Sequence, residues 1–145
     1  MKNTYTTSLN LPKLDFILLI FRIGISILML FHGVPKLINF FSSEEIQFAD
    51  PLGVGQTMTL AVAVLAEFVC SIMLILGIGT RIATIPLIVT MAVAAIIVHA
   101  PDGLERQELP FMYLLSYVLL FYTGAGKYSL DHYLMFKAEK KEIKP

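Results

Sequence analysis

Four long apolar runs, separated by short polar segments, make up most of the chain. They cover residues 14–38, 57–76, 82–99 and 109–123. A helix rises about 1.5 Å per residue, so about 20 residues cross a hydrocarbon core of about 30 Å, and the fourth run reaches that length only with its flanks. Since lipid offers no hydrogen bonds to an open backbone, each run is expected to be helical. The pattern predicts an all-α membrane protein, a four-helix transmembrane bundle that forms one domain over residues 1–145.

The composition supports this class and excludes others. Of the 145 residues, 57% are hydrophobic and 15% are charged, against about 45–50% and about 25% in soluble domains. The 11 basic and 11 acidic residues cancel, so no net field attracts nucleic acid, and the lipid bilayer is the expected partner. The single cysteine, Cys70, excludes a disulfide within the chain, a CxxC redox pair and an all-cysteine metal or iron–sulfur site.

Lysine and arginine gather on one side of the predicted bundle. Lys2 and Lys13 precede the first run, Arg81 lies in the turn between the second and third runs, and several lysines follow the fourth. By the positive-inside rule this side faces the cytoplasm, so both termini are expected there. Residues 127–145 are expected to form a cytoplasmic tail. Within this tail, Ser129 is the predicted N-cap of a short helix at the membrane surface, and the alternative is a solvated tail.

Two charged residues lie within the predicted spans. Arg22 belongs to a polar stripe on the first helix, and Glu67 to a similar stripe on the second. Counted from the cytoplasmic ends of the helices, Arg22 lies about 12 Å and Glu67 about 15 Å into the membrane. Since an unpaired charge there costs at least a few kcal/mol, we expect an Arg22–Glu67 ion pair. This pair either fixes only the register of the two helices, or it forms part of a site for a small molecule, a proton or a quinone headgroup.

A second polar group is expected toward the outer ends of the helices. His32 and Lys36 lie there on the first helix, His99 closes the third, and Glu105 and Glu108 lead into the fourth. Imidazole and carboxylate groups bind divalent metals, an imidazole also ligates haem, and His and Lys can donate hydrogen bonds to a quinone carbonyl. The alternative is that these His and Lys side chains only reach out of the membrane to water. The spacing matches no metal motif, so we predict no metal site and take His32, Lys36, His99 and Glu108 as candidate ligand-binding residues.

A resemblance to a known family extends over about residues 14–131. It is carried by three stretches, FRIGISILMLFHGVPKL, AEFVCSIMLILGIGTRIATIPLIVTMAVAAIIVHA and ELPFMYLLSYVLLFYTGAGKYSLD. In this order and spacing they resemble the DoxX family of small four-helix bacterial membrane proteins. The shared pattern is an Arg and a His-Gly-x-x-Lys on the first helix, a Glu before a Leu-Gly-x-x-Thr-Arg turn, a His at the end of the third helix, and a Gly-x-Gly-x-x-Ser-Leu-Asp after the fourth. The matching positions here are His32–Gly33, Lys36, Glu67, Arg81, His99 and Gly124–Asp131.

The resemblance implies a function. Members of the family are similar to a subunit of a quinone-reducing thiosulfate oxidoreductase, and others are linked to membrane complexes that handle thiols and oxidative stress. We therefore expect a subunit of, or partner to, a quinone-linked redox complex of the bacterial inner membrane, with a quinone as ligand. The electron carrier would come from a membrane or soluble redox partner, because this chain has no evident cofactor motif of its own.

Two alternatives to the redox role are kept. One is a non-catalytic protein for small-molecule binding, transport or assembly, and the other is a purely structural membrane component. Whether the protein is an enzyme is left open at this point. Small residues such as Gly24 and Ala92 allow close helix contacts within the chain or between copies in a homo-oligomer.

Overall fold

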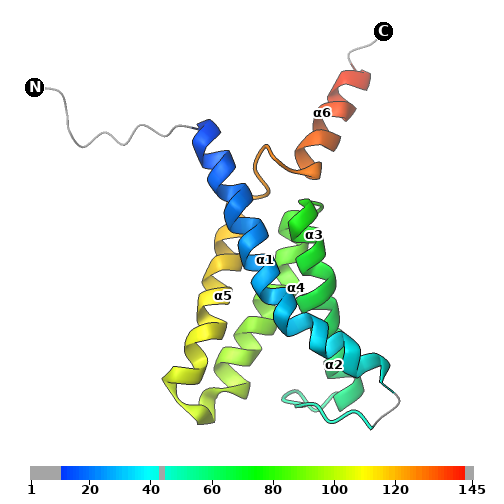
Figure 1. The fold of residues 1–145 in the computed structure, drawn as a ribbon, viewed down its shortest axis with the longest axis vertical. Helices are drawn as coiled ribbons and strands as arrows, with labels where there is room; N and C mark the ends of the chain where they lie inside the picture. Colours follow the sequence, from blue (N-terminus) through cyan, green and yellow to red (C-terminus); the bar gives the residue numbers. More distant parts are fainter. Residues whose placement is uncertain (1–10, 43–44, 143–145) are drawn as a thin grey trace, which may run out of the picture.

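The computed structural model describes residues 11–42 and 45–142, and within these ranges the chain is helical and has no strand. Figure 1 shows helical rods that pack side by side. The first rod is α1 (Leu11–Phe41). The second runs through α2 (Gln56–Val64), the π-helical turn η1 (Leu65–Cys70) and α3 (Ser71–Leu76), and the third through α4 (Thr80–Val93) and the π-helical turn η2 (Ala94–Val98). A 3-10 turn, η3 (Ala100–Asp102), leads to α5 (Leu104–Thr123), and α6 (Leu130–Glu142) follows.

The two ends of this helical assembly carry different segments. The end that holds the start of α1, the Gly77–Gly79 turn and α6 is called the terminal side and lies at the top of Figure 1. The opposite end holds residues 45–55 and η3 and is called the loop side.

In the described part of the chain, three helical segments are long and apolar enough to cross a membrane. They are Leu11–Phe41, Gln56–Leu76 and Thr80–Val98. The α5 helix has 20 residues, but Glu105 and Glu108 make its first turns polar, and it is not one of the three. The all-helical membrane class predicted from the apolar runs is thus confirmed, and a fourth crossing by α5 stays a prediction.

The helix bounds differ from the predicted ones chiefly where polar residues extend a helix. The first helix runs from Leu11 to Phe41 rather than from 14 to 38. The α5 helix begins at Leu104 rather than at 109, directly after Gly103, whose φ of +84° ends the preceding turn. The first turns of α5 carry no apolar periodicity, so the sequence pattern assigns them to a loop although they are helical.

The hydrophobic core lies between α1, the η1–α3 segment, α4 and α5, with α1 packed on the second rod and α4 packed on α5. Large apolar side chains outside this core stay exposed, such as Phe31 at 72% and Ile82 at 71%. In a bilayer, lipid tails cover such side chains, so a narrow protein core is sufficient. The core residues are Met29, Cys70, Leu74, Ala83, Leu87, Met91, Tyr113, Tyr117 and Leu120.

The connection between α5 and α6 folds back over the terminal side and is held there by Arg22. The buried Arg22 guanidinium donates hydrogen bonds to the carbonyl oxygens of Ala125 (2.7 Å) and Tyr128 (2.9 Å). Gly77 lies directly against it, because a Cβ on Gly77 would come within 2.6 Å of Nη1 of Arg22. Arg22 therefore ties the α5–α6 connection to the first helix.

Two capping side chains complete the terminal side. The Asp131 carboxylate accepts hydrogen bonds from the backbone N–H groups of Gly79 (2.7 Å) and Thr80 (3.0 Å), and it thereby caps the start of α4. The Ser129 hydroxyl oxygen accepts a hydrogen bond from the N–H of His132 (3.2 Å). This bond confirms Ser129 as the N-cap of α6.

Replacing Asp131 with asparagine is expected to lower the free energy of unfolding by about 1–2 kcal/mol. The change removes the negative charge and one of the two acceptor oxygens at the positive end of α4. The measurement is unfolding by sodium dodecyl sulfate in mixed micelles. Glu108→Gln is the matched control: it neutralises an exposed carboxylate on α5 and should change stability by less than about 0.5 kcal/mol. Equal effects of the two changes would show that Asp131 is not an important cap.

On the loop side, Asp50 organises the entry into α2. Its carboxylate accepts hydrogen bonds from the N–H groups of Val54 (3.1 Å) and Gly55 (2.7 Å) and from the Thr59 hydroxyl (2.8 Å). These bonds, that of Gly55 first, hold the pKa of the Asp50 carboxyl below its usual range. The turn therefore keeps its charge-assisted hydrogen bonds at neutral pH and loses them only as the pH falls through that lowered pKa.

Candidate functional site

Lys36 and Glu67 form an ion pair between α1 and η1. Both carboxylate oxygens of Glu67 bond to Nζ of Lys36. The Glu67 side chain is 3% exposed and that of Lys36 is 27% exposed. A buried carboxylate is costly without a partner, and Lys36 supplies that partner. Nζ of Lys36 also lies 5.9 Å from the centroid of the Phe48 ring, so it links the helices to residues 45–55.

The close approach of α1 to η1 sets this pair in place. Gly33 lies nearly one turn before Lys36 and packs on the backbone of Glu67. A Cβ on Gly33 would come within 2.7 Å of the carbonyl carbon and oxygen of Glu67 and within 2.9 Å of the Phe68 nitrogen. Only glycine permits this contact, and the contact brings the side chains of Lys36 and Glu67 together.

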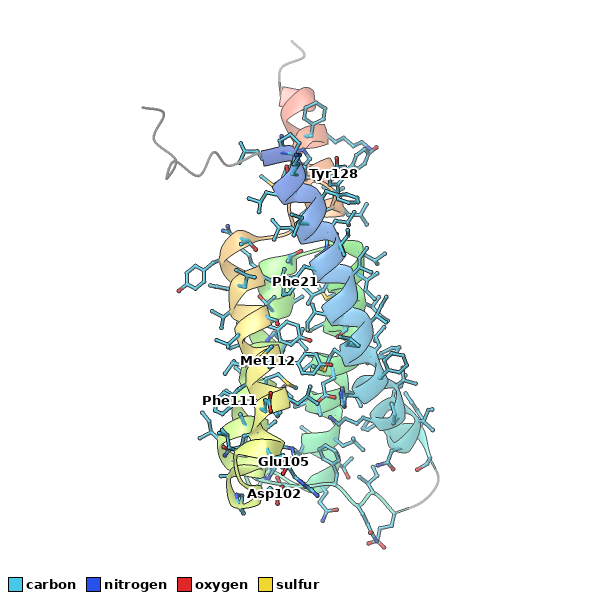
Figure 2. The ribbon with its side chains drawn as sticks, turned by 60° about the vertical axis from the view of Figure 1, so that its left-hand side comes forward. Phe21, Asp102, Glu105, Phe111, Met112 and Tyr128 are labelled. Atoms are coloured by element: carbon cyan, nitrogen blue, oxygen red, sulfur yellow. The ribbon has the colours of Figure 1, made fainter. Side chains whose placement is uncertain are left out.

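A pocket of about 370 Å³ contains the ion pair and reaches the loop side. Its inner part includes the buried Glu67, and its outer part includes the exposed side chains of Glu105 and Arg106. Figure 2 shows Glu105 together with Asp102 at the loop-side end of the molecule. The lining residues are Met29, His32, Lys36, Glu67, Met91, Ala94, His99, Glu105, Arg106, Leu109, Pro110 and Tyr113.

The polar groups of the outer part are partly paired. Nδ1 of His99 lies 3.1 Å from an Asp102 carboxylate oxygen, and the Arg106 guanidinium lies 3.9 Å from the same carboxylate. The His32 ring meets the Tyr113 ring edge to face, with 5.9 Å between the centroids. Donors, acceptors and a protonatable imidazole therefore surround a pocket whose other walls are apolar. Within the described ranges, no three His, Cys, Asp or Glu side chains are arranged to hold a metal ion.

Two π-helical turns border this pocket. Glu67 lies on η1, and η2 contributes Ala94 and ends directly before His99. A π-turn inserts one extra residue into a helix and rotates the side chains that follow, and such turns occur frequently at functional sites. Both turns thus alter the helical register at the residues that line the pocket.

The structure brings three of the four candidate ligand-binding residues together. His32, Lys36 and His99 all line the pocket, as does Glu105. Glu108 does not. The α5 residues that line the pocket, from Glu105 to Tyr113, share one face of the helix, and at 100° per residue Glu108 lies about 130° from the centre of that face.

The predicted Arg22–Glu67 ion pair is wrong. Glu67 bonds to Lys36, and Arg22 bonds to the α5–α6 connection. The reason is the register of the two helices: Gly33 packs on Glu67 while Arg22 packs on Gly77. Arg22 therefore lies about 16 Å along the helix axis from the level of Glu67. Depths counted from the ends of the apolar runs miss this offset, because they assume that the runs start at one level, whereas Arg22, eight residues into the first run, lies against Gly77, just past the end of the second.

Sequence reasoning missed several residues of the site. The apolar pattern does not separate Tyr113, Met29 and Met91 from core residues, and all three are buried as well as lining the pocket. For Asp102 the available signal is its spacing of three residues from His99, which suits the contact that it makes. Arg106 lies in the first turn of α5, which begins directly after Gly103. The apolar pattern does not include this turn in a helix, so it gives no sign that Arg106 faces the pocket.

Comparison with known proteins agrees with the sequence resemblance. The model of the DoxX family matches residues 17–100, which is more than half of the chain. The chain belongs to the DoxX family. The matched part of this DoxX protein includes His32, Lys36, Glu67 and His99, whereas the α5 wall of the pocket lies outside it.

Two proteins of Haemophilus influenzae, both described as uncharacterized, are similar to this DoxX protein. One is 34% identical over 132 residues, which cover 85% of this chain and 95% of the relative. The other is 30% identical over 98 residues, which cover 64% of this chain and 65%, just under two thirds, of the relative. No solved structure matches the DoxX chain significantly.

Proposed function

We propose that this protein crosses the bacterial inner membrane four times, with both termini in the cytoplasm, and binds a quinone headgroup in the loop-side pocket. It would act there as a subunit of, or partner to, a quinone-linked redox complex. The single observation that carries the proposal is the pocket itself, in which a buried Lys36–Glu67 pair and two histidines meet apolar walls. Intramembrane charges that line a cavity are functional candidates by default.

The orientation rests on the distribution of charge. Lys13, Arg81, Lys127 and Lys137 lie on the terminal side, against Lys36 and Arg106 on the loop side, where they stand among the acids Glu45, Asp50, Asp102, Glu105 and Glu108. The positive-inside rule then puts the terminal side in the cytoplasm and the pocket at the periplasmic face. The apolar part of α5 is the proposed fourth crossing, with its polar first turns at the periplasmic surface.

The pocket suits a ring with carbonyl oxygens. Its volume of about 370 Å³ lies toward the small end of ligand sites, which are about 300–1,000 Å³. Met29, Met91 and Leu109 offer apolar contact to a ring. The Lys36 ammonium sits on a flexible stem, whereas Glu67 is held by the backbone contact with Gly33. Lys36 is therefore the group that can turn from Glu67 toward a ligand oxygen.

Reduction of a quinone to a hydroquinone takes two electrons and two protons. The His99–Asp102 pair lies at the outer part of the pocket, where an imidazole nitrogen can donate a hydrogen bond to a quinone oxygen or accept one from a hydroquinone. The electrons would come from a partner protein with its own redox group, since the one cysteine, Cys70, is buried in the core. The role of this chain would be to bind and orient the quinone.

A binding titration with a short-chain quinone tests the site. His99→Ala and Tyr113→Phe each remove one polar group of the pocket and leave the Lys36–Glu67 pair intact. His132→Ala is the matched control, because His132 is an exposed histidine on the terminal side. Losing one hydrogen bond of about 1–1.4 kcal/mol should weaken binding about five- to tenfold in the pocket variants and leave the control unchanged.

The same titration separates the two functional classes. Equal quinone binding by wild type and pocket variants, or no binding at all, contradicts the proposed site. Equally tight binding of a matched aromatic ketone without redox activity would favour the alternative, a protein that binds small molecules without taking part in a redox reaction.

A cysteine-labelling experiment tests the orientation. Gln47→Cys places a thiol in the exposed loop-side segment, and Lys127→Cys places one on the terminal side, while the native Cys70 is buried. We expect an impermeant thiol reagent to label the first variant in intact cells and the second only after lysis. The reverse pattern would show that the protein has the opposite orientation. Labelling of both variants in intact cells would contradict the proposed topology.

A further inference from the structure

A second cavity lies on the terminal side, far from the site described above. It is a groove of about 680 Å³ between the start of α4, the α5–α6 connection and α6. Arg81 and His132 contribute polar side chains to it, and Ile82, Leu134 and Met135 contribute apolar ones. Figure 1 shows these segments gathered at the end that carries α6.

Two polar side chains of this groove, those of Thr80 and Arg81, can still form hydrogen bonds to a ligand. Thr80 lines it and is 1% exposed, and its hydroxyl oxygen has no hydrogen-bond partner in the part of the chain that the structure describes. The Arg81 side chain makes one long contact, 3.5 Å, to the carbonyl oxygen of Tyr122. Asp131 is the acid beside these groups, and its two oxygens are already occupied by the N–H groups that cap α4. Among the side chains that the structure describes, no carboxylate forms a salt bridge with Arg81, so the groove presents an unpaired cation, with the Asp131 carboxylate as a second charge in its lining.

The apolar side of the groove lies where a membrane surface is expected. The α4 helix is one of the candidate spans and begins at Thr80. The side chains of Ile82, Leu134 and Met135 are each more than half exposed. A site at the end of a span, with a cation beside exposed apolar side chains, has the chemistry of the boundary between lipid headgroups and acyl chains.

We propose that this groove binds an anionic phospholipid. The lipid phosphate pairs with the Arg81 guanidinium and accepts a hydrogen bond from His132, while the Thr80 hydroxyl donates to a headgroup or ester oxygen. One acyl chain lies along Ile82, on the side of the groove that faces the span. A free phosphate offers the same charge but no chain for Ile82 to contact, so the apolar half of the groove favours the lipid. This site is independent of the quinone proposal and requires only that the protein lies in a membrane.

Native mass spectrometry of lipids retained on the purified protein tests the proposal. The protein is equilibrated in micelles with phosphatidylglycerol, with phosphatidylcholine, or with inorganic phosphate. Arg81→Gln removes the proposed phosphate partner, and Arg81→Lys keeps the positive charge. Arg106→Gln is the control, because Arg106 is an exposed arginine on the loop side. Thr80→Val removes only the unpartnered hydroxyl.

We expect wild type to retain phosphatidylglycerol in preference to phosphatidylcholine. Arg81→Gln should weaken that retention about fivefold, Arg81→Lys and Arg106→Gln should preserve it, and Thr80→Val should weaken it without lowering the thermal midpoint of unfolding. Equal retention of the two lipids by wild type, full retention by Arg81→Gln, or equal loss in Arg106→Gln would overturn the proposal. So would phosphate ions that raise the thermal midpoint as much as the lipid does, because that result points to a soluble anion.

Discussion

Replacing Gly33 with alanine is expected to lower the free energy of unfolding by about 3 kcal/mol, the upper end of the range for overpacking. The added Cβ would lie 2.7 Å from the backbone carbonyl of Glu67. No rotation of a side chain relieves a contact with backbone, so α1 must move away from η1. That movement also separates Lys36 from Glu67. We expect a lower midpoint of unfolding in mixed micelles and weaker quinone binding by the folded fraction.

Gly24→Ala is the matched control on the same helix. Gly24 is exposed, and a Cβ there would have nothing within 4 Å. Since alanine favours a helix over glycine, this change should be neutral or stabilising by up to about 1 kcal/mol. Gly33→Ala should therefore lower the free energy of unfolding, whereas Gly24→Ala should leave it unchanged or raise it. A Gly33→Ala variant as stable as Gly24→Ala would contradict the close contact between α1 and η1.

Replacing Lys36 with methionine is expected to cost about 3 kcal/mol, the lower end of the range for breaking a buried ion pair. Glu67 would be left buried without a cation, and it must either stay charged at that cost or take up a proton. The lower end applies because part of the Lys36 side chain is exposed. The measurement is again the free energy of unfolding in mixed micelles.

A double-mutant cycle identifies the true partner of Glu67. Combining Lys36→Met with Glu67→Met should cost about 2 kcal/mol less than the sum of the single changes, because the double variant buries no unpaired charge. Combining Arg22→Met with Glu67→Met should be additive, since Arg22 bonds to Ala125 and Tyr128 instead. Coupling in the second cycle and additivity in the first would restore the Arg22–Glu67 pair and contradict the register described above.

The fold class could be predicted from the sequence because lipid imposes a strong rule. An apolar run of about 20 residues has few alternatives to a helix, and the runs over α1, η1 and α4 followed that rule. The start of α5 could not be predicted in the same way. Glu105 and Glu108 extend the helix beyond the apolar region, and polar residues at a membrane surface are compatible with either a helix or a loop.

The sequence predicts some residues of the candidate site, but it does not predict how they pair. His32, Lys36 and His99 stand out because polar side chains are rare in apolar runs, so their positions alone suggest a common level. The partner of Glu67 depends on the register between two helices, which is set by one glycine contact at Gly33 and not by helix length. Tyr113 could not be recognised, because an aromatic residue at helical spacing looks the same in a core and in a pocket wall.

A photoreactive quinone tests most directly whether the pocket around Lys36 and Glu67 is a ligand site. The azido analogue is added to membrane vesicles that contain the protein, and the vesicles are illuminated. The labelled peptides are then identified by mass spectrometry. We predict labels on the part of α1 that holds His32 and on the part of α5 that holds Tyr113, both abolished by excess unmodified quinone. Labels confined to other segments, or labels at these segments that excess quinone does not remove, would contradict the site.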